Sequence, residues 1–253
     1  MKLPVIFVGH GTPMNAIEQN TFTASWQALG KKIKPKGILM VSAHWFTHGS
    51  WTQDSESPKV INDMYGFPKA LYEVNYTVHG NRQLTEKIVA LLSPDTKINN
   101  DWGIDHGAWS VLTHMYPKRD VPVVQLSIDA HKTPEEHYAL GRKLRALRQE
   151  GYLIMGSGNI VHNLRRVAFD KTDGYEWANT FDRQIKEAIE TRKFEKCINY
   201  TDFGEAATLS VPTTDHYDPL LYVLGAVETQ DQVTIFNKAS VMGSLSMTSY
   251  IFE

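Results

Sequence analysis

Residues 3–13 read Leu-Pro-Val-Ile-Phe-Val-Gly-His-Gly-Thr-Pro, and residues 37–45 read Gly-Ile-Leu-Met-Val-Ser-Ala-His-Trp. Each begins with a short apolar run that predicts a buried strand, over residues 3–8 and 37–42. Between the two runs, apolar side chains recur at the spacing of an amphipathic helix: Phe22, Trp26, Leu29 and Ile33. A strand, a helix and a second strand form a β-α-β unit, whose two strands run parallel.

The same alternation continues along the chain, with amphipathic stretches that predict helices and apolar runs that predict strands. The expected helices cover residues 82–92, 134–149, 175–191 and 216–226, and the expected strands cover residues 121–128, 151–156, 232–236 and 241–250. No repeat, low-complexity segment or long linker divides the sequence. We therefore expect an α/β fold with one domain over residues 1–253, built on a central, mostly parallel sheet flanked by helices.

Composition excludes several classes of protein. Of the 253 residues, 42% are hydrophobic and 21% charged, which are ordinary values for a globular protein. A formal net charge of −2 gives no indication of nucleic-acid binding. The single cysteine, Cys197, excludes an internal disulfide and a cysteine-based zinc site. The first residues lack signal-peptide features, and no stretch approaches the roughly 20 apolar residues that span a bilayer, so we expect a cytoplasmic protein.

Histidines directly follow several of the expected strands. His10 follows the first strand between two glycines, and His44 follows the second. We expect these two parallel strands to be neighbours, which places both side chains at the carboxyl edge of the sheet, where α/β folds bind ligands. One histidine there is explained by a capped strand end, but two at equivalent positions favour a shared metal. His162, which follows the strand at 151–156, belongs to the same edge.

Two further histidines stand beside aspartates. His216 follows Asp215 ahead of an apolar helix, and His106 follows Asp105 in an Asp-His-Gly loop. Each aspartate is able either to cap the next helix or to orient a neighbouring imidazole. Histidines and carboxylates without thiolates favour Fe(II), Zn or Mn. The Gly-x-Ser-x-Gly elbow of an α/β-hydrolase and the helical His-Glu-x-x-His zinc motif are both absent from the sequence.

Six motifs together resemble one known family. They are Gly-His-Gly-Thr-Pro (9–13), Ser-Ala-His-Trp (42–45), Tyr-Gly-Phe-Pro (65–68), Gly-Ile-Asp-His-Gly (103–107), Gly-Asn-Ile-Val-His-Asn (158–163) and Asp-His-Tyr (215–217). In this order they are similar to the DODA-type extradiol aromatic ring-opening dioxygenases, the single-domain branch of the class III extradiol, or LigB-like, superfamily. The resemblance runs from residue 3 to the segment 243–247, which is nearly the whole chain.

The resemblance implies a non-haem Fe(II) enzyme that inserts both atoms of O2 into a catechol such as 3,4-dihydroxyphenylalanine (DOPA), with 4,5-cleavage to a semialdehyde. By motif, His10, His44 and His216 match the metal ligands. His162 matches the acid/base, and His106 matches a residue that contacts substrate or bound oxygen. Many relatives carry a carboxylate where this chain has His216. Because three or four neutral imidazoles make a good zinc site, we expect protein purified in air to carry Zn(II), with His162 as a fourth ligand.

Two other functions fit the same histidines. A zinc-dependent hydrolase would use them to activate water, and a non-enzymatic metal-binding or signalling relative would keep the fold without the reaction. The expected partners are a small catechol and O2, with no nucleic acid and no membrane, in a monomer or small homo-oligomer. Tyr65, Phe67 and Tyr72 form either an apolar wall over the substrate ring or part of the core.

Overall fold

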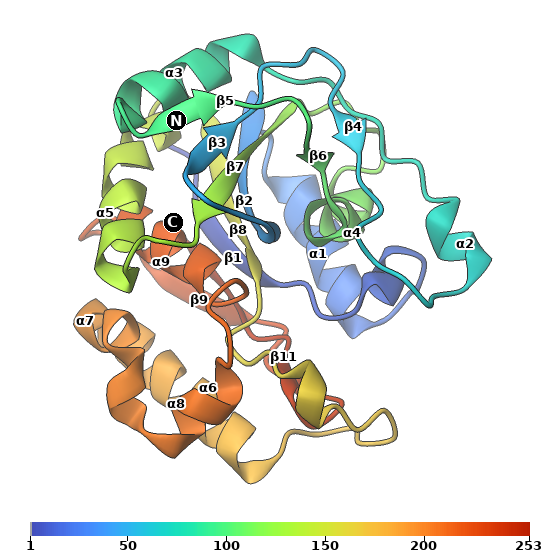
Figure 1. Ribbon diagram of the computed structural model, residues 1–253, viewed down its shortest axis with the longest axis vertical. Helices are drawn as coiled ribbons and strands as arrows, with labels where there is room; N and C mark the ends of the chain where they lie inside the picture. The colour runs from blue at the N-terminus through green and yellow to red at the C-terminus, as the bar shows by residue number, and fades with distance from the viewer. Residues whose placement is uncertain (1) are drawn as a thin grey trace.

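An eight-stranded sheet runs through the centre of the molecule (Figure 1). The computed structural model describes residues 2–253. In spatial order the sheet contains β5 (Thr96–Ile98), β3 (Ser50–Thr52), β7 (Val123–Asp129), β2 (Gly37–Thr47), β8 (Tyr152–Gly158), β1 (Val5–Gly9), β12 (Ser249–Phe252) and β9 (Val233–Phe236). Two-stranded ribbons pair β4 (Lys59–Val60) with β6 (Gly103–Ile104), and β10 (Ser240–Val241) with β11 (Leu245–Ser246).

The core of the sheet is parallel, as expected. Strands β7, β2, β8 and β1 run parallel to one another, and β12 and β9 add an antiparallel edge. The expected adjacency of β1 and β2 is wrong, because β8 lies between them and pairs with both. All seven residues of β8 are buried, which suits the middle position of a sheet covered on both faces. Parallel direction followed from the β-α-β pattern, whereas lateral order did not.

Helices cover both faces of the sheet. They are α1 (Thr21–Lys32), α2 (Lys69–Tyr72), α3 (Arg82–Leu92), α4 (His106–Met115), α5 (Pro134–Leu144), α6 (Glu176–Glu190), α7 (Phe194–Ile198), α8 (Glu205–Ser210) and α9 (Asp218–Ala226). One apolar cluster joins α1 and α4 to one face of the sheet, with the buried rings of Trp26 and Trp109. A second cluster joins α3, α5, α6 and α9 to the other face. The result is a single α/β domain in which α6, α7 and α8 gather at one end (Figure 1).

Local sequence explains where several helices begin. Helix α1 starts at a capping box in which Asn20 and Thr23 exchange hydrogen bonds. Helix α5 starts at a second box made by Thr133 and Glu136, with Pro134 at its first position. The helix expected over 134–149 ends earlier, at Leu144, and continues as a short 3-10 turn, Arg145–Arg148.

The strand expected over residues 241–250 is interrupted. Met242 and Gly243 both adopt positive φ, of 53° and 75°, and this turn separates β10 from β11. The chain then returns to the main sheet as β12. Apolar composition alone did not reveal this turn. In the part of the chain that the structure describes, no helix has the length and apolar character needed to cross a membrane.

Candidate metal centre

Five histidines from distant parts of the sequence converge at the carboxyl edge of the central strands. His10 follows β1, His44 lies near the end of β2, and His162 follows β8. His106 is the first residue of α4, and His216 precedes α9. Each ring lies between 3.4 and 5.1 Å from its nearest neighbour, centroid to centroid. All five histidines that the sequence motifs singled out therefore meet in one cluster, called here the five-histidine cluster.

Three of these rings form a nearly equilateral triangle. The ring centroids of His10 and His44 are 5.1 Å apart, those of His10 and His216 are 5.3 Å apart, and those of His44 and His216 are 5.0 Å apart. His10 and His216 are buried, and His44 is half-buried. These are the three residues whose motifs match metal ligands.

Each ring of the triangle is held through its Nδ1 atom. The Nδ1 atom of His44 lies 3.0 Å from an oxygen of Asp63, and that of His216 hydrogen-bonds to Asp215 at 2.5 Å. Because a carboxylate only accepts hydrogen bonds, both rings carry their proton on Nδ1. The Nδ1 atom of His10 lies 3.0 Å from the hydroxyl of Ser157.

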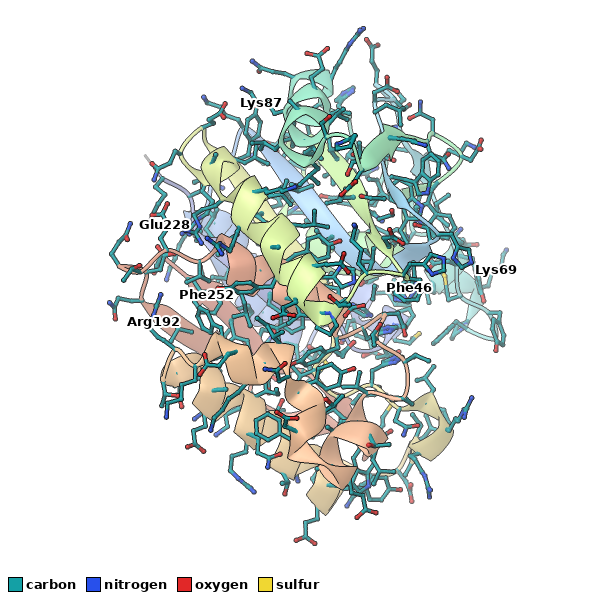
Figure 2. All side chains as sticks on the ribbon, turned by 60° about the vertical axis from the view of Figure 1, so that its left-hand side comes forward. Phe46, Lys69, Lys87, Arg192, Glu228 and Phe252 are labelled. Carbon is teal, nitrogen blue, oxygen red and sulfur yellow. The ribbon has the colours of Figure 1, made fainter. Side chains whose placement is uncertain are left out.

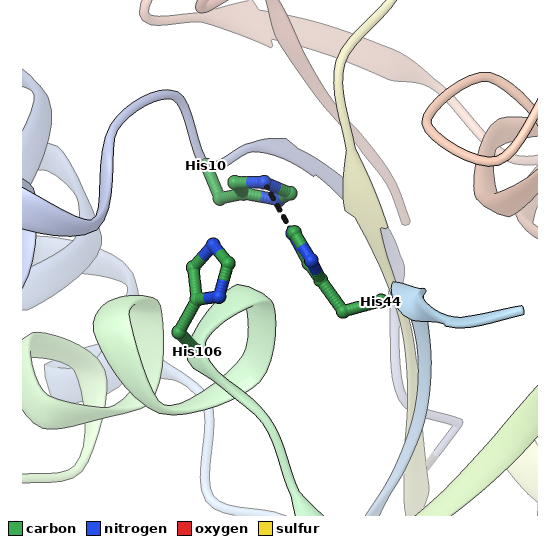
Figure 3. Close-up of side chains that lie close together, drawn as sticks. All are labelled: His10, His44 and His106. Carbon is green, nitrogen blue, oxygen red and sulfur yellow. Dashed lines mark hydrogen bonds between the residues drawn. The ribbon is translucent and has the colours of Figure 1, made fainter. Parts of the chain in front are cut away.

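The same tautomer follows for His10. The Ser157 hydroxyl donates its proton to the carbonyl oxygen of Gly107 at 2.6 Å, so it accepts from His10. All three rings therefore present the lone pair of Nε2. The Nε2 atoms of His10 and His44 are 3.3 Å apart (Figure 3), and Nε2 of His216 is buried without a hydrogen-bond partner among residues 2–253.

This donor set fits a metal ion. Lone pairs that face one another repel unless a cation lies between them, and tetrahedral ligands about 2.0–2.1 Å from an ion are themselves about 3.3 Å apart. Metal-bound histidines usually donate their other ring nitrogen to a carboxylate or another acceptor, as these three do. The residues present therefore match what a metal-dependent site requires.

His106 lies beside the first two rings and closer to His44 than to His10 (Figure 3). Ligand nitrogens of His10, His44 and His106 fall within 4.8 Å of one another, and the ring centroids of His44 and His106 are 3.8 Å apart. A second group within the same limit contains His162, Asp215 and His216. The cluster thus offers more than one set of three ligands.

His162 stacks on His216. Their ring centroids are 3.4 Å apart and the two planes differ by 5°. The backbone N–H of His162 donates to the carbonyl oxygen of Ser210 at the end of α8, and an isolated bridge pairs His162 with Leu245. Burial lowers the pKa of the His162 imidazole to about 4, with smaller contributions from nearby charges. The ring is therefore neutral near pH 7 and able to accept a proton.

Burial also controls the charge of the other rings. It lowers the pKa of His10 and His216 well below the ordinary value, and neighbouring histidines lower both further. Burial lowers the pKa of His106 as well, against the opposing effect of Asp63. His44 differs, because the hydrogen bond to Asp63 and the nearby charges of Asp105, Asp63 and Asp215 together outweigh the effect of burial and raise its pKa.

Sequence reasoning missed Asp63. This residue lies in the loop after β4, and one carboxylate oxygen lies 3.0 Å from Nδ1 of His44. The other oxygen accepts the backbone N–H of His106 and lies 3.0 Å from its Nδ1. Hydrogen bonds from His106 and His44 lower the pKa of Asp63 despite burial, which alone would raise it. Asp63 lies two residues before the Tyr-Gly-Phe-Pro motif (65–68), but that motif does not include it, so only the tertiary structure reveals the role of this carboxylate.

Asp105 and Asp215, for which the sequence allowed either helix capping or orientation of an imidazole, have different roles in the structure. Asp105 is the N-cap of α4 and accepts from Ala108 N and Ser42 Oγ, so its capping interpretation is confirmed. Asp215 contacts the ring of His216 and makes no cap, so the orienting interpretation holds for it.

Of the three aromatic residues expected near the substrate, Tyr65 and Phe67 lie in the loop before α2 and Tyr72 ends α2, and they do not share one surface. Tyr65 is 92% exposed, whereas Phe67 packs against the core cluster on the α1 and α4 side. The hydroxyl oxygen of half-buried Tyr72 accepts the backbone N–H of Phe67 at 3.3 Å. Phe67 therefore belongs partly to the core, as one of the two interpretations held.

An α/β sheet whose carboxyl edge holds a buried, multi-histidine, metal-binding centre defines a class of metal-dependent enzymes. Comparison with known families shows to which family within this class the chain belongs. The family described as "Catalytic LigB subunit of aromatic ring-opening dioxygenase" matches residues 4–253, and the chain belongs to this family of metal-dependent dioxygenases.

Relatives agree over nearly the full length. The chain is 46% identical to the 4,5-DOPA dioxygenase extradiol of Escherichia coli K12 over 98% of this chain and 94% of that protein. It is 34% identical to the protein of the same name from Beta vulgaris, over 97% and 95%. The crystal structure of an uncharacterized Escherichia coli K12 protein superposes with a TM-score of 0.88 at 42% identity, covering 100% of both chains.

Proposed function

We propose that this protein is an extradiol ring-cleaving dioxygenase that acts on a catechol such as DOPA, with a non-haem Fe(II) ion. The observation that carries the proposal is the triangle of His10, His44 and His216, in which every Nδ1 is anchored and every Nε2 presents a lone pair. We assign these three residues as the metal ligands. The names of the relatives support the substrate, and the family match over residues 4–253 supports one catalytic domain over residues 1–253.

The side chains around the triangle divide the remaining work. Bound Fe(II) supplies the redox chemistry that couples a catechol to O2. Neutral His162 accepts the proton of a catechol hydroxyl at its ring nitrogen, and returns it to an oxygen atom later in the reaction. His106, held by Asp63 beside His44, hydrogen-bonds to charge that develops on oxygen.

The test begins with removal of the metal. The protein is stripped, reloaded with Fe(II) without air, and mixed with DOPA before O2 is admitted, while O2 uptake and visible absorbance are followed together. Stoichiometric uptake with a yellow semialdehyde product in the Fe(II) form, and none in the Zn(II) form, is the expected result. Product analysis then tests 4,5-cleavage.

The neutral imidazoles also suit zinc, which keeps a zinc-dependent hydrolase as the second candidate. The two functions differ in their need for O2, because hydrolysis consumes none. Absence of O2 uptake with DOPA and a panel of small catechols would overturn the dioxygenase proposal. It would favour the hydrolase or a non-enzymatic metal-binding protein. Metal analysis of protein purified in air tests the expected Zn(II), with His162 as a fourth ligand.

A further inference from the structure

Two histidines outside the five-histidine cluster lie against each other on the surface. His48 lies in the turn between β2 and β3, and His131 lies in the loop between β7 and α5. Both side chains are exposed. Nδ1 of His48 is 2.6 Å from Nε2 of His131, and the rings stack with their centroids 4.5 Å apart and their planes 24° apart. No motif in the sequence links these two residues.

The two loops are fixed by one carboxylate. The same oxygen of Asp129 accepts the backbone N–H of Gly49 at 3.0 Å and that of His131 at 3.1 Å. The turn that carries His48 is closed further by Trp51, whose indole N–H donates to the carbonyl oxygen of His48 at 3.0 Å. The imidazole pair is thus held by backbone contacts that do not depend on the rings themselves.

Two facing imidazole nitrogens are a chelate for a soft or borderline cation. At 2.6 Å one ring must donate its proton to the lone pair of the other. A divalent ion that replaces this shared proton binds both lone pairs after the nitrogens separate to about 3 Å, given metal–nitrogen distances of about 2.0–2.1 Å. Exposed side chains make this small movement freely. Imidazole nitrogen favours Zn, Ni and Cu, whereas Mg and Ca favour oxygen.

The surrounding charges also favour a cation. Asp129 brings a carboxylate to the base of both loops. The nearest cationic neighbour in the sequence, Lys132, lies 3.5 Å from an oxygen of Asp95 and is drawn to that residue. We propose that His48 and His131 form a second, surface-exposed binding site for a divalent cation of the Zn(II), Ni(II) or Cu(II) class.

His48 directly follows β2, the strand that carries the proposed metal ligand His44. His48 lies four positions after His44, so their Cα atoms lie no more than about 14 Å apart. Phe46, between them, is exposed on the surface (Figure 2). The two sites share no ligand, and the surface site does not depend on the proposed function. Its consequence is a metal content above one equivalent per chain.

The experiment uses protein whose five-histidine cluster is first saturated with Zn(II) and then freed of excess metal. Ni(II) is added, and binding is followed by calorimetry in wild type, His48→Gln and His131→Gln. His79→Gln is the matched control, because His79 is also exposed and stacks on no other imidazole among residues 2–253. Melting temperatures confirm that each variant is folded.

Wild type and His79→Gln should each bind one further Ni(II). Loss of either ligand should weaken this binding about tenfold or more, because the second nitrogen no longer acts at high local concentration. With Cu(II) as the probe, electron paramagnetic resonance should show two coupled nitrogens in wild type and one in each variant. Unchanged Ni(II) binding in either His48→Gln or His131→Gln would overturn the proposal, as would equal loss in His79→Gln.

Discussion

The rings of His162 and His216 stack with their centroids 3.4 Å apart, and we propose different roles for the two residues. His216 has its Nδ1 anchored by Asp215, whereas among residues 2–253 the ring of His162 makes no hydrogen bond and is positioned through its backbone. A ring that no hydrogen bond orients is free to turn between partners, which suits the proposed role of His162 in moving a proton. This difference is the basis for testing the two residues separately.

Substitution of His162 by Gln should leave the metal content unchanged and lower kcat by a factor of about 10²–10⁴, the usual contribution of acid–base catalysis. Metal analysis and O2 uptake on the same preparation check both parts. His216→Gln should instead lose metal. If His162→Gln loses metal to the same extent, His162 is a ligand, and its assignment as acid/base alone is wrong.

Substitution of Asp63 tests how strongly metal binding depends on the carboxylate that orients His44 and His106. Replacement by Asn keeps the size of the side chain but removes the charge that orients His44 and His106. We expect metal affinity to fall about 10–100-fold, as is typical when a carboxylate behind a metal ligand is removed. Competition with a chelator measures this directly. Asp101→Asn, at an exposed carboxylate, is the control and should bind metal as wild type does.

At the scale of elements, the cluster depends on a close approach between β8 and the segment before α9. A Cβ atom on Gly158 would lie 2.1 Å from the carbonyl oxygen of His216, a distance at which the backbone must shift. The neighbouring Asn159 N–H donates to that same carbonyl oxygen at 2.9 Å. Glycine at the end of β8 therefore sets the position of one proposed ligand.

Gly158→Ala should lower the free energy of unfolding by about 1–3 kcal/mol, the usual cost of overpacking a filled site, and should weaken metal binding by displacing His216. Urea unfolding and chelator competition measure the two effects. Gly37→Ala is the control, because the nearest atom to its added methyl is the side-chain amide nitrogen of Asn81 at 3.0 Å and the nearest backbone atom lies 3.5 Å away. Equal behaviour of the two variants would contradict this account.

The helices and strands themselves were more predictable from the sequence than the order in which the strands lie side by side. Residues 82–92 form the expected helix to the residue, because apolar spacing, an N-cap and Pro94 all act locally. The insertion of β8 between β1 and β2 depends on packing across the whole sheet, which local patterns do not encode. Motifs found the five histidines, but Asp63 lies outside every motif, two residues before the one at 65–68, and its contacts with His44 and His106 form only in the folded chain.

At the scale of the whole molecule, one buried ion pair joins the two ends of the chain. Arg148 and Asp231 are both fully buried, and two guanidinium nitrogens contact the two carboxylate oxygens at 2.6 and 3.1 Å. Arg148 also donates to the carbonyl oxygens of Leu3, Ala226 and Phe252. Arg148, at the end of the 3-10 turn that precedes β8, thereby holds together the start of β1, the end of α9 and the end of β12. On the same side, Arg192 donates to the carbonyl oxygens of Asp231 and Glu228 (Figure 2).

Arg148→Met should lower the free energy of unfolding by about 3–5 kcal/mol, because it leaves the carboxylate of Asp231 buried without its main partner. Urea denaturation at pH 7 measures this. Arg82→Met is the matched control, since the guanidinium of Arg82 lies on the surface beside Glu86 and contributes little. A loss in Arg148→Met no larger than that in Arg82→Met would show that the ion pair does not hold the termini.

The same pair predicts how stability depends on pH. Burial alone would raise the pKa of Asp231, but hydrogen bonds from Arg148 and Lys2 outweigh it and lower the pKa to about 2. The unfolded chain holds this carboxyl near its ordinary pKa of about 3.9, so between these values the unfolded state binds more protons. The contribution of Asp231 is therefore complete above about pH 5 and is lost as the pH falls toward 2. Urea unfolding from pH 5 to 2 should show this loss in wild type. Arg148→Met should show a shallower slope, because its Asp231 keeps Lys2 but loses Arg148, the first-named of the two cations that lower its pKa. Equal slopes in the two proteins would mean that other carboxylates determine the acid sensitivity.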